Sequence, residues 1–300
     1  MQNDSTRSPL SVAGIQFLHE GEPGIPLPRW ITPTWRGSRV VDEPIRVFHA
    51  VGDTSTEGLQ PVISTELPHG DYYVDDERKM AIRARIAGPP VDRPQLLRTT
   101  ASGFSYTIRY ASAEDALRGQ WGWHRTIFMF ALPMRRRGLS VHSTGFILPG
   151  RRGVVCPGVS GAGKSTLAKL LLAASPSELT VLGDDRIAVT AEPEGLHLWG
   201  TPWHSSAGAA VADDAPCSAM VFVARGDGAR ITRLAPREAM TRLIRTVAIP
   251  FWDPEGTEFA LSLIDQMVTT LPCFEFAYAP TNGAIVRLVD ELSAAISTRN

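Results

Sequence analysis

The alternation of apolar and polar positions changes period along the chain. In residues 70–113, segments such as Met80 to Ile86 and Phe104 to Tyr110 alternate apolar residues with basic or polar ones. This is the period of a half-buried strand, so we predict a small antiparallel sheet here. Residues 1–70 are rich in proline and glycine. Because proline lacks the N–H that regular structure needs, we expect this region to be mostly irregular, with short apolar pieces such as Ile45-Arg46-Val47-Phe48 as edge strands.

A long helix is predicted next, from about Ala113 to Met134. Ser112 suits the N-cap, and Glu114 and Asp115 carry negative charge near the positive end of the helix dipole. The basic run Arg135 to Arg137 follows, and such a run is typical of a solvated helix end.

From residue 139 onward, short apolar runs alternate with helical segments. The strand-like runs lie at 139–142, 144–148, 153–157, 180–183, 218–223 and 274–278, and the predicted helices lie at 167–174, 236–247, 260–271 and 284–296. This order indicates an α/β fold with a mixed sheet. We therefore divide the chain into a β-rich, proline- and glycine-rich region at 1–112 and a second domain at 113–300.

Composition excludes several classes of protein. Hydrophobic residues make up 43% and charged residues 20% of the chain, which is not a disordered composition. Thirty Lys and Arg oppose 31 Asp and Glu, so a nucleic-acid partner is not expected. No apolar stretch approaches the roughly 18–20 residues that span a bilayer, and residues 1–9 carry no signal-peptide pattern. We expect a soluble, cytoplasmic protein without a membrane partner, with its three cysteines buried and reduced.

One segment carries a specific chemical signature, the pattern G-x-x-x-x-G-K-[ST] of a P-loop. It comprises Gly158, Val159, Ser160, Gly161, Ala162, Gly163, Lys164 and Ser165, followed by Thr166. A predicted strand precedes it and a predicted helix follows it, as the motif requires. Glycines let successive N–H groups turn towards phosphate oxygens, Lys164 reaches the β- and γ-phosphates, and Ser165 ligates Mg²⁺. The predicted cofactors are ATP and Mg²⁺.

Two acids end the next apolar strand, Val181-Leu182-Gly183-Asp184-Asp185. They come only 20 and 21 residues after Lys164 (184−164 and 185−164). Two adjacent acids at a strand end point in different directions. One can hold Mg²⁺ while the other takes a proton from an incoming hydroxyl.

Three elements in order resemble the HPr kinase/phosphorylase family, whose P-loop domain is related to that of phosphoenolpyruvate carboxykinases. They are Val141-His142-Ser143, the loop from Gly158 to Thr166, and the early Asp184-Asp185. The resemblance covers roughly residues 139–290 and implies a P-loop kinase core of that type. It also implies that His142 supports Asp185, the base that deprotonates a serine hydroxyl. Asp184 is then the acid that holds the metal together with Ser165. An arginine that assists the phosphoryl group is implied as well; Arg242 and Arg245 are the candidates, and Arg245 enters the predicted site.

The chain departs from the family in two places. The family has a metal-binding glutamate after the Asp pair, whereas the comparable stretch here, 200–206, contains no acid. His204 is our candidate for lining the substrate site instead. The N-terminal half also differs from that of the HPr kinases. The chain therefore resembles divergent members, some of which modify a ribosomally made peptide such as a lasso-peptide precursor and others of which phosphorylate small molecules.

The sequence thus predicts a kinase that transfers the γ-phosphate of ATP to a hydroxyl, first of all a serine of a peptide or protein. Two alternatives stay open. One is a kinase for a small metabolite, such as free serine or a sugar. The other is a nucleotide-binding regulator that transfers no phosphate. The resemblance also allows a homo-oligomer, because related kinases often form them.

Overall fold

The computed structural model describes residues 10–25, 43–66, 69–75, 80–86, 93–99, 104–174 and 179–297. The chain divides into two compact units. Unit 1 comprises Met1–Arg135 and Pro250–Thr257, and unit 2 comprises Arg136–Ile249 and Glu258–Asn300. This division assigns the long helix to unit 1, whereas the boundary expected from the sequence lies between residues 112 and 113. Each unit contains a mixed sheet and helices, so the protein is a mixed α/β protein.

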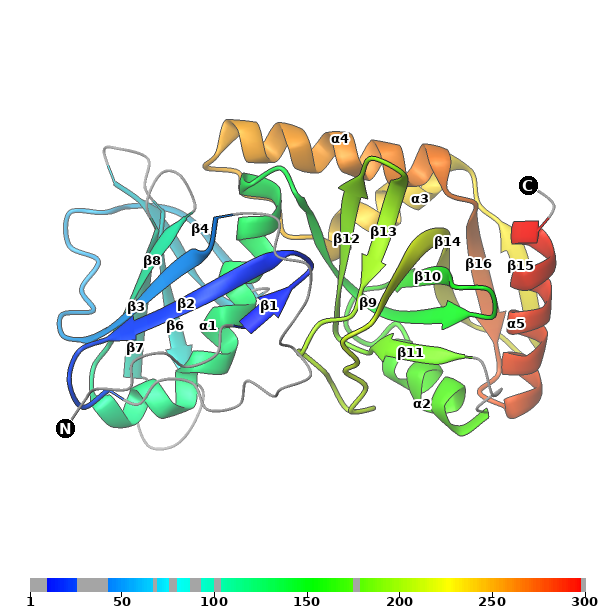
Figure 1. Cartoon of the computed structure of the whole chain (residues 1–300), viewed down its shortest axis with the longest axis horizontal. Helices are drawn as coiled ribbons and strands as arrows, with labels where there is room; N and C mark the ends of the chain where they lie inside the picture. Colours follow the sequence, from blue (N-terminus) through cyan, green and yellow to red (C-terminus); the bar gives the residue numbers. More distant parts are fainter. Residues whose placement is uncertain are drawn as a thin grey trace. The chain divides into compact units, whose positions relative to one another are not determined.

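Unit 1 contains an eight-stranded sheet in the order β1-β2-β3-β8-β7-β6-β5-β4 (Figure 1). Its strands are β1 (Leu10–Val12), β2 (Ile15–Gly21), β3 (Ile45–Val51), β4 (Gln60–Glu66), β5 (His69–Val74), β6 (Met80–Ile86), β7 (Arg93–Thr99) and β8 (Ser105–Tyr110). Strands β4 to β8 pair antiparallel, which confirms the small antiparallel unit predicted from the alternation. Strand β3 pairs in parallel with both β2 and β8.

The expectation that residues 1–70 are mostly irregular is wrong for the described part of that region, which forms β1 to β4. Strand β3 finds its second partner in β8, about 60 residues later in the chain, at the register Phe48↔Thr107. Proline density is a local signal and does not reveal such non-local pairing. Pro61 lies where β4 shifts register against β5, a position where a missing N–H is tolerated. Pro26, Pro28 and Pro33 lie outside the described residues.

Helix α1 (Ala113–Met134) has the bounds predicted from the sequence. Ser112 caps it by accepting a hydrogen bond from the N–H of Asp115 at 3.3 Å. The apolar face includes Ile127 and Phe128, both fully buried. The indole of Trp123 donates to the side-chain carbonyl of Gln95 on β7, a buried polar contact that fixes the helix on the sheet.

Unit 2 is built from the second eight-stranded sheet. Its strands are β9 (Gly138–Leu148), β10 (Arg152–Pro157), β11 (Thr180–Gly183), β12 (Arg186–Glu192), β13 (Gly195–Trp199), β14 (Asp214–Arg225), β15 (Ala229–Arg233) and β16 (Cys273–Tyr278). Two long strands each pair in two places. The first half of β9 pairs with β12 and the second half with β10 and β11. Likewise, β14 pairs first with β13 and then with β10 and β16.

The helices of unit 2 pack on these strands in two groups (Figure 1). They are α2 (Lys164–Ala174), α3 (Pro236–Leu243), α4 (Pro254–Thr270) and α5 (Asn282–Ser297), with a short 3-10 helix, η2 (Ile244–Thr246), after α3. The division of the chain assigns residues 254–257 of α4 to unit 1 and the rest of the helix to unit 2. Apolar residues of α2 and α5 share one core with β10, β14 and β16. Apolar residues of α3 and α4 share another with β9, β12 and β13. Strand β10 is therefore buried from Gly153 to Pro157, which fixes the position of the loop that follows it.

Several sequence-based elements need correction at their ends. The runs at 139–142 and 144–148 form one strand, β9. The helix predicted at 236–247 stops as an α-helix at Leu243 and tightens into η2. The sequence analysis missed the β12–β13 hairpin and β15. The three cysteines are free and buried, as expected. In the part of the chain that the structure describes, no helix is both long enough and apolar enough to cross a membrane.

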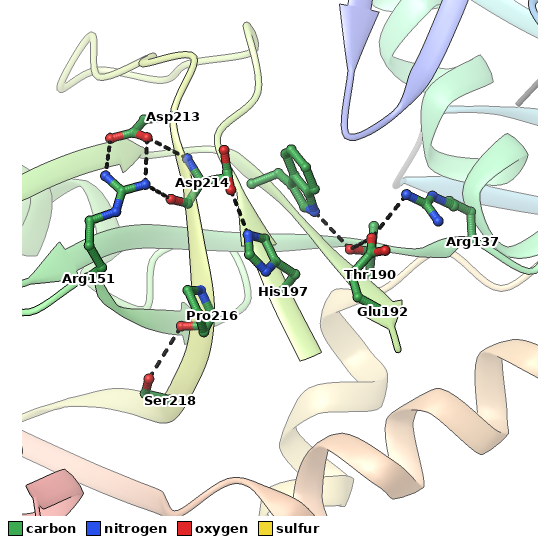
Figure 2. A network of polar contacts seen from close by, with 10 residues as sticks. Arg137, Arg151, Thr190, Glu192, His197, Asp213, Asp214, Pro216 and Ser218 are labelled. Carbon is green, nitrogen blue, oxygen red and sulfur yellow. Dashed lines mark hydrogen bonds and ion pairs between the residues drawn. The ribbon is translucent and has the colours of Figure 1, made fainter. Parts of the chain in front are cut away.

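Polar side chains tie β12, β13 and β14 to the neighbouring turns (Figure 2). His197 and Asp214 contact each other at 2.6 Å between Nε2 and Oδ2. Arg151, in the turn between β9 and β10, donates two hydrogen bonds of 2.9 Å to the carboxylate of Asp213. Arg137 forms an ion pair with Glu192 at 3.0 Å. At least this arginine of the 135–137 run therefore has a structural partner rather than only solvent.

Candidate active site

The glycine-rich loop connects β10 to α2 in the strand–loop–helix order predicted from the sequence. Gly161 and Gly163 have φ angles of 80° and 99°, in the left-handed region that residues with a Cβ rarely adopt. The N–H of Leu167 donates to the carbonyl of Gly163 at 2.9 Å, which begins the hydrogen bonding of α2. The loop therefore needs glycine at these two positions in order to enter the helix.

Backbone bonds hold the start of the loop. The N–H of Gly158 donates to the carbonyl of His142 at 3.1 Å. A Cβ at Gly158 would lie 3.0 Å from the Cβ of Ala162, so the loop is tightly closed here. Val159, Ser160 and Gly161 are exposed, as is Thr166, whereas Ala162, Gly163 and Ser165 are half-buried. The loop thus presents its middle residues to solvent, and in the first turn of α2 Thr166 is exposed.

Lys164 is the first residue of α2, and its side chain lies along the loop. Its Nζ donates to the carbonyl of Val159 at 3.0 Å, and its own carbonyl accepts a bond of 3.0 Å from the Thr144 hydroxyl on β9. Burial lowers the pKa of Lys164 to about 8; the charge of Asp185 opposes this shift and that of Arg186 adds to it. A buried cation with a lowered pKa favours an anionic ligand beside it.

His142 and Asp185 lie together near this lysine. The Nε2 of His142 is 3.7 Å from Oδ1 of Asp185, and both side chains keep about 15% exposure (15% and 14%). The backbone supports this pair, because the N–H of Ser143 donates to the carbonyl of Asp185 at 3.1 Å. Strands β9 and β12 therefore bring together the histidine, the second acid and Lys164, which the sequence analysis singled out at separate positions.

Asp184 has a different environment from its neighbour. It is 1% exposed. One carboxylate oxygen accepts from the N–H of Ser205 at 2.8 Å, and the other accepts from the N–H of Ala207 at 2.7 Å. Asp184 thus anchors the turn at 205–207, a contact that the sequence did not predict.

The same anchored segment carries His204. It is exposed, and its Nδ1 lies 3.3 Å from the Ser205 carbonyl. Just before the residues that Asp184 binds, Thr201 and Trp203 are completely buried, and the Thr201 hydroxyl donates to the carbonyl of Arg186 at 2.6 Å. His204 is therefore a solvent-facing side chain on a well-held turn that is bonded to the first acid.

The two candidate arginines, Arg242 and Arg245, differ in the ion pairs that they form and in their exposure. Arg242 forms ion pairs with Glu238 at 2.6 Å and with Glu275 at 2.7 Å. Arg245 is exposed on η2. A β-bridge between Val141 and Val247 places this segment beside β9, one residue from His142. Among the described residues Arg245 forms no ion pair, so its side chain is better suited than that of Arg242 to meet a ligand.

Arg186 is a functional candidate that the sequence analysis missed. It is 5% exposed, lies opposite His142 in the β9–β12 pairing, and its charge lowers the pKa of Lys164. Its position directly after the acid pair was the available signal. In the sequence, an arginine directly after two acids suggests an ion pair at the surface. The fold shows instead that Arg186 is a second buried cation beside Lys164.

Comparison with known proteins gives a remote likeness among solved structures. No protein-family model matches this chain, and no curated protein matches its sequence. Among solved structures, the chain is similar to the Hpr(Ser) kinase/phosphatase from Coxiella burnetii, with 11% identity and a TM-score of 0.29. The match covers 53% of this chain and 97% of the other. A likeness at this identity and TM-score carries no functional argument, so the chemistry must be argued from the residues of the site itself.

Proposed function

We propose that this chain is an ATP- and Mg²⁺-dependent kinase that transfers a γ-phosphate to a hydroxyl, with a serine of a peptide or protein as the first candidate acceptor. The observation that carries the proposal is the grouping of Lys164, Asp185 and His142 at the glycine-rich loop. A cation for phosphate and a carboxylate for a hydroxyl proton are the two groups that such a transfer requires.

The loop supplies the phosphate-binding part of the proposal. Gly161 and Gly163 give it the curled backbone whose N–H groups can face an anion, and the N-terminus of α2 adds its positive dipole end. Lys164 would exchange its bond to the Val159 carbonyl for phosphate oxygens. The nearby charge of Arg186 adds to the positive potential at this point.

Asp185 would act as the base. The acceptor hydroxyl gives its proton to the Asp185 carboxylate, its oxygen forms the new bond to the γ-phosphorus, and the bond from that phosphorus to the β–γ bridging oxygen breaks to release ADP. His142, at 3.7 Å from Asp185, would orient this carboxylate. Arg245 would approach the transferred group, and His204 the acceptor. Most of the rate gain would come from positioning and electrostatics.

Hard oxygen donors for Mg²⁺ are present, because the Ser165 hydroxyl opens α2 and the two carboxylates follow β11. The residues therefore fit the ion. Bound Mg²⁺ would neutralise charge on the phosphates. Since the oxygens of Asp184 already accept two backbone N–H groups, Ser165 is the ligand with the more available oxygen, and any bond from Asp184 must use its remaining lone pairs.

The proposal is tested by following a labelled γ-phosphate. The purified chain is incubated with Mg²⁺, γ-labelled ATP and a cell extract separated into a polypeptide fraction and a metabolite fraction, with Lys164→Met as the matched control. Label in polypeptide that the control does not produce supports the peptide or protein acceptor. Label in small molecules favours the metabolite kinase. ATP binding without transfer to either fraction favours the regulator, and absence of ATP binding would refute all three.

Nucleotide affinity is expected to fall as the pH rises through the pKa of Lys164. With a free-state pKa of about 8, the protonated fraction drops about tenfold between pH 7 and pH 9, so the affinity for ATP should drop about tenfold if only the charged form binds phosphate. Affinity falls with rising pH because a bound phosphate raises the pKa of Lys164, so ATP binding takes up a proton. Calorimetric titration at several pH values measures the effect.

Lys164→Arg is the matched control for this pH dependence, because guanidinium keeps its charge up to pH 9. Its affinity for ATP should stay flat over the same range, whatever its absolute value. An equal loss of affinity in the wild type and in Lys164→Arg would show that another group, and not Lys164, titrates.

A further inference from the structure

Three histidines converge in unit 1, away from the glycine-rich loop in the chain. They are His19 on β2, His49 on β3 and His124 on α1, and we call them the histidine cluster. His49 and His124 are completely buried and His19 is half-buried. The parallel pairing of β2 with β3 sets Gly21 opposite His49, so the first two histidines lie on neighbouring strands, and α1 covers them.

The nitrogens of the cluster face one another. Nδ1 of His19 lies 3.2 Å from Nε2 of His124 and 3.4 Å from Nε2 of His49. One ligand atom from each residue can be chosen so that all three lie within 4.8 Å of one another. The ring centroids of His19 and His124 are 4.5 Å apart, with the planes tilted by 65°. The rings are thus not simply stacked as apolar surfaces.

Hydrogen bonding within the cluster cannot satisfy both close contacts. Each imidazole nitrogen has one in-plane site, which holds either a proton or a lone pair. Nδ1 of His19 can therefore make one good hydrogen bond, to His49 or to His124 but not to both. Nε2 of His19 is also buried without a hydrogen-bond partner among the described residues. An ion that accepts all three lone pairs removes the conflict.

The spacing agrees with a tetrahedral metal centre. Zinc–nitrogen bonds of 2.0–2.1 Å at tetrahedral angles place the ligand nitrogens about 3.3–3.4 Å apart. The two short separations in the cluster are 3.2 and 3.4 Å. We infer that His19, His49 and His124 bind a divalent transition-metal ion of the zinc type, through one ring nitrogen each.

The surroundings suit this ion. Imidazoles bind metals in their neutral form. Burial, His124 and His49 lower the pKa of His19 well below its ordinary value, and burial and His124 lower the pKa of His49 to about 3. Nδ1 of His49 lies 2.9 Å from the hydroxyl of Tyr110, the outer-shell contact that fixes a metal-binding ring. With three protein ligands, the fourth coordination position of the ion would be occupied by water or a small anion. His19 is half-buried, so solvent would reach the ion from its side of the cluster.

Metal uptake by the tag-free full chain tests the inference. The protein is treated with chelator, dialysed, and titrated with Zn²⁺ and with Co²⁺, whose visible d–d bands report tetrahedral nitrogen ligation. We expect one ion per chain and a tetrahedral Co²⁺ spectrum. His49→Gln and His124→Gln should each weaken binding by more than about a hundredfold, because a lost ligand costs more than a lost outer-shell partner. Tyr110→Phe should weaken it about tenfold.

His197→Gln is the matched control, since this histidine pairs with Asp214 in unit 2. It should bind one ion with wild-type affinity. His19→Gln, at the half-buried position, guards against variants that fail to fold, and circular dichroism monitors all of them. Lack of stoichiometric uptake by the wild type would overturn the inference. Undiminished binding in folded His19→Gln, or equal loss in His197→Gln, would also overturn it. None of these three outcomes depends on phosphate transfer, so they test the metal site separately from the proposed function.

Discussion

Asp185→Asn is expected to lower the rate of phosphate transfer by about 10²–10⁴-fold, the range that a positioned general base contributes. The proposed base touches only the acceptor proton, so ATP binding should survive the change. The isosteric amide also preserves the backbone bond from the N–H of Ser143 to the carbonyl of residue 185. Single-turnover transfer of labelled phosphate measures the rate, and calorimetry measures the binding.

The pH of this measurement matters because Asp185 raises the pKa of Lys164. Removing the carboxylate will lower that pKa further below 8, so binding should be compared near about pH 6.5, where the lysine stays charged in both proteins. Asp213→Asn is the matched control, because this carboxylate pairs with Arg151 at the surface. His142→Gln should cost about tenfold in rate and shift the pH profile. Full turnover by Asp185→Asn would refute the base assignment.

The sequence was most informative where a signal is local. The N-cap at Ser112 and the acidic first turn determine where α1 begins, and both are read within four residues. The strand–loop–helix order around residues 158–165 follows equally from a contiguous pattern. Such elements were predictable because their stabilising contacts lie within the same segment.

The features that were missed depend on pairing between distant segments. The apolar run at 45–48 indicated an edge strand, whereas β3 lies between β2 and β8. The histidine cluster joins positions 19, 49 and 124, which no spacing rule connects. For the same reason, Arg186 became a site candidate only once β9 and β12 placed it opposite His142. The sequence could name the chemical groups around the glycine-rich loop, but not which of them are buried, and burial decides their charge and their role.

Asp184 shows the consequence of burial most clearly, and Asp184→Ala is expected to destabilise unit 2 by about 2–4 kcal/mol. Hydrogen bonds to charged groups contribute about 1.5–3 kcal/mol each, and this carboxylate makes two, to the N–H groups of Ser205 and Ala207. Ser205 is exposed, so water can replace part of the loss. The melting temperature should fall by about 4–16 °C, given about 2–4 °C per kcal/mol for a domain of this size.

Asp213→Ala is the comparison that separates a buried anchor from a surface pair. Asp213 accepts two hydrogen bonds from Arg151 and one from the N–H of Asp214. The Asp213 and Arg151 side chains are 32% and 58% exposed, so the loss of this pair should cost less than about 1 kcal/mol. Calorimetric melting of both variants tests the contrast. If Asp184→Ala melts like the wild type yet needs far more Mg²⁺ for transfer, Asp184 acts as a metal ligand and not as an anchor. If the melting temperature falls and the Mg²⁺ requirement is unchanged, Asp184 anchors the 205–207 turn, and Ser165 is the ligand on which Mg²⁺ binding depends.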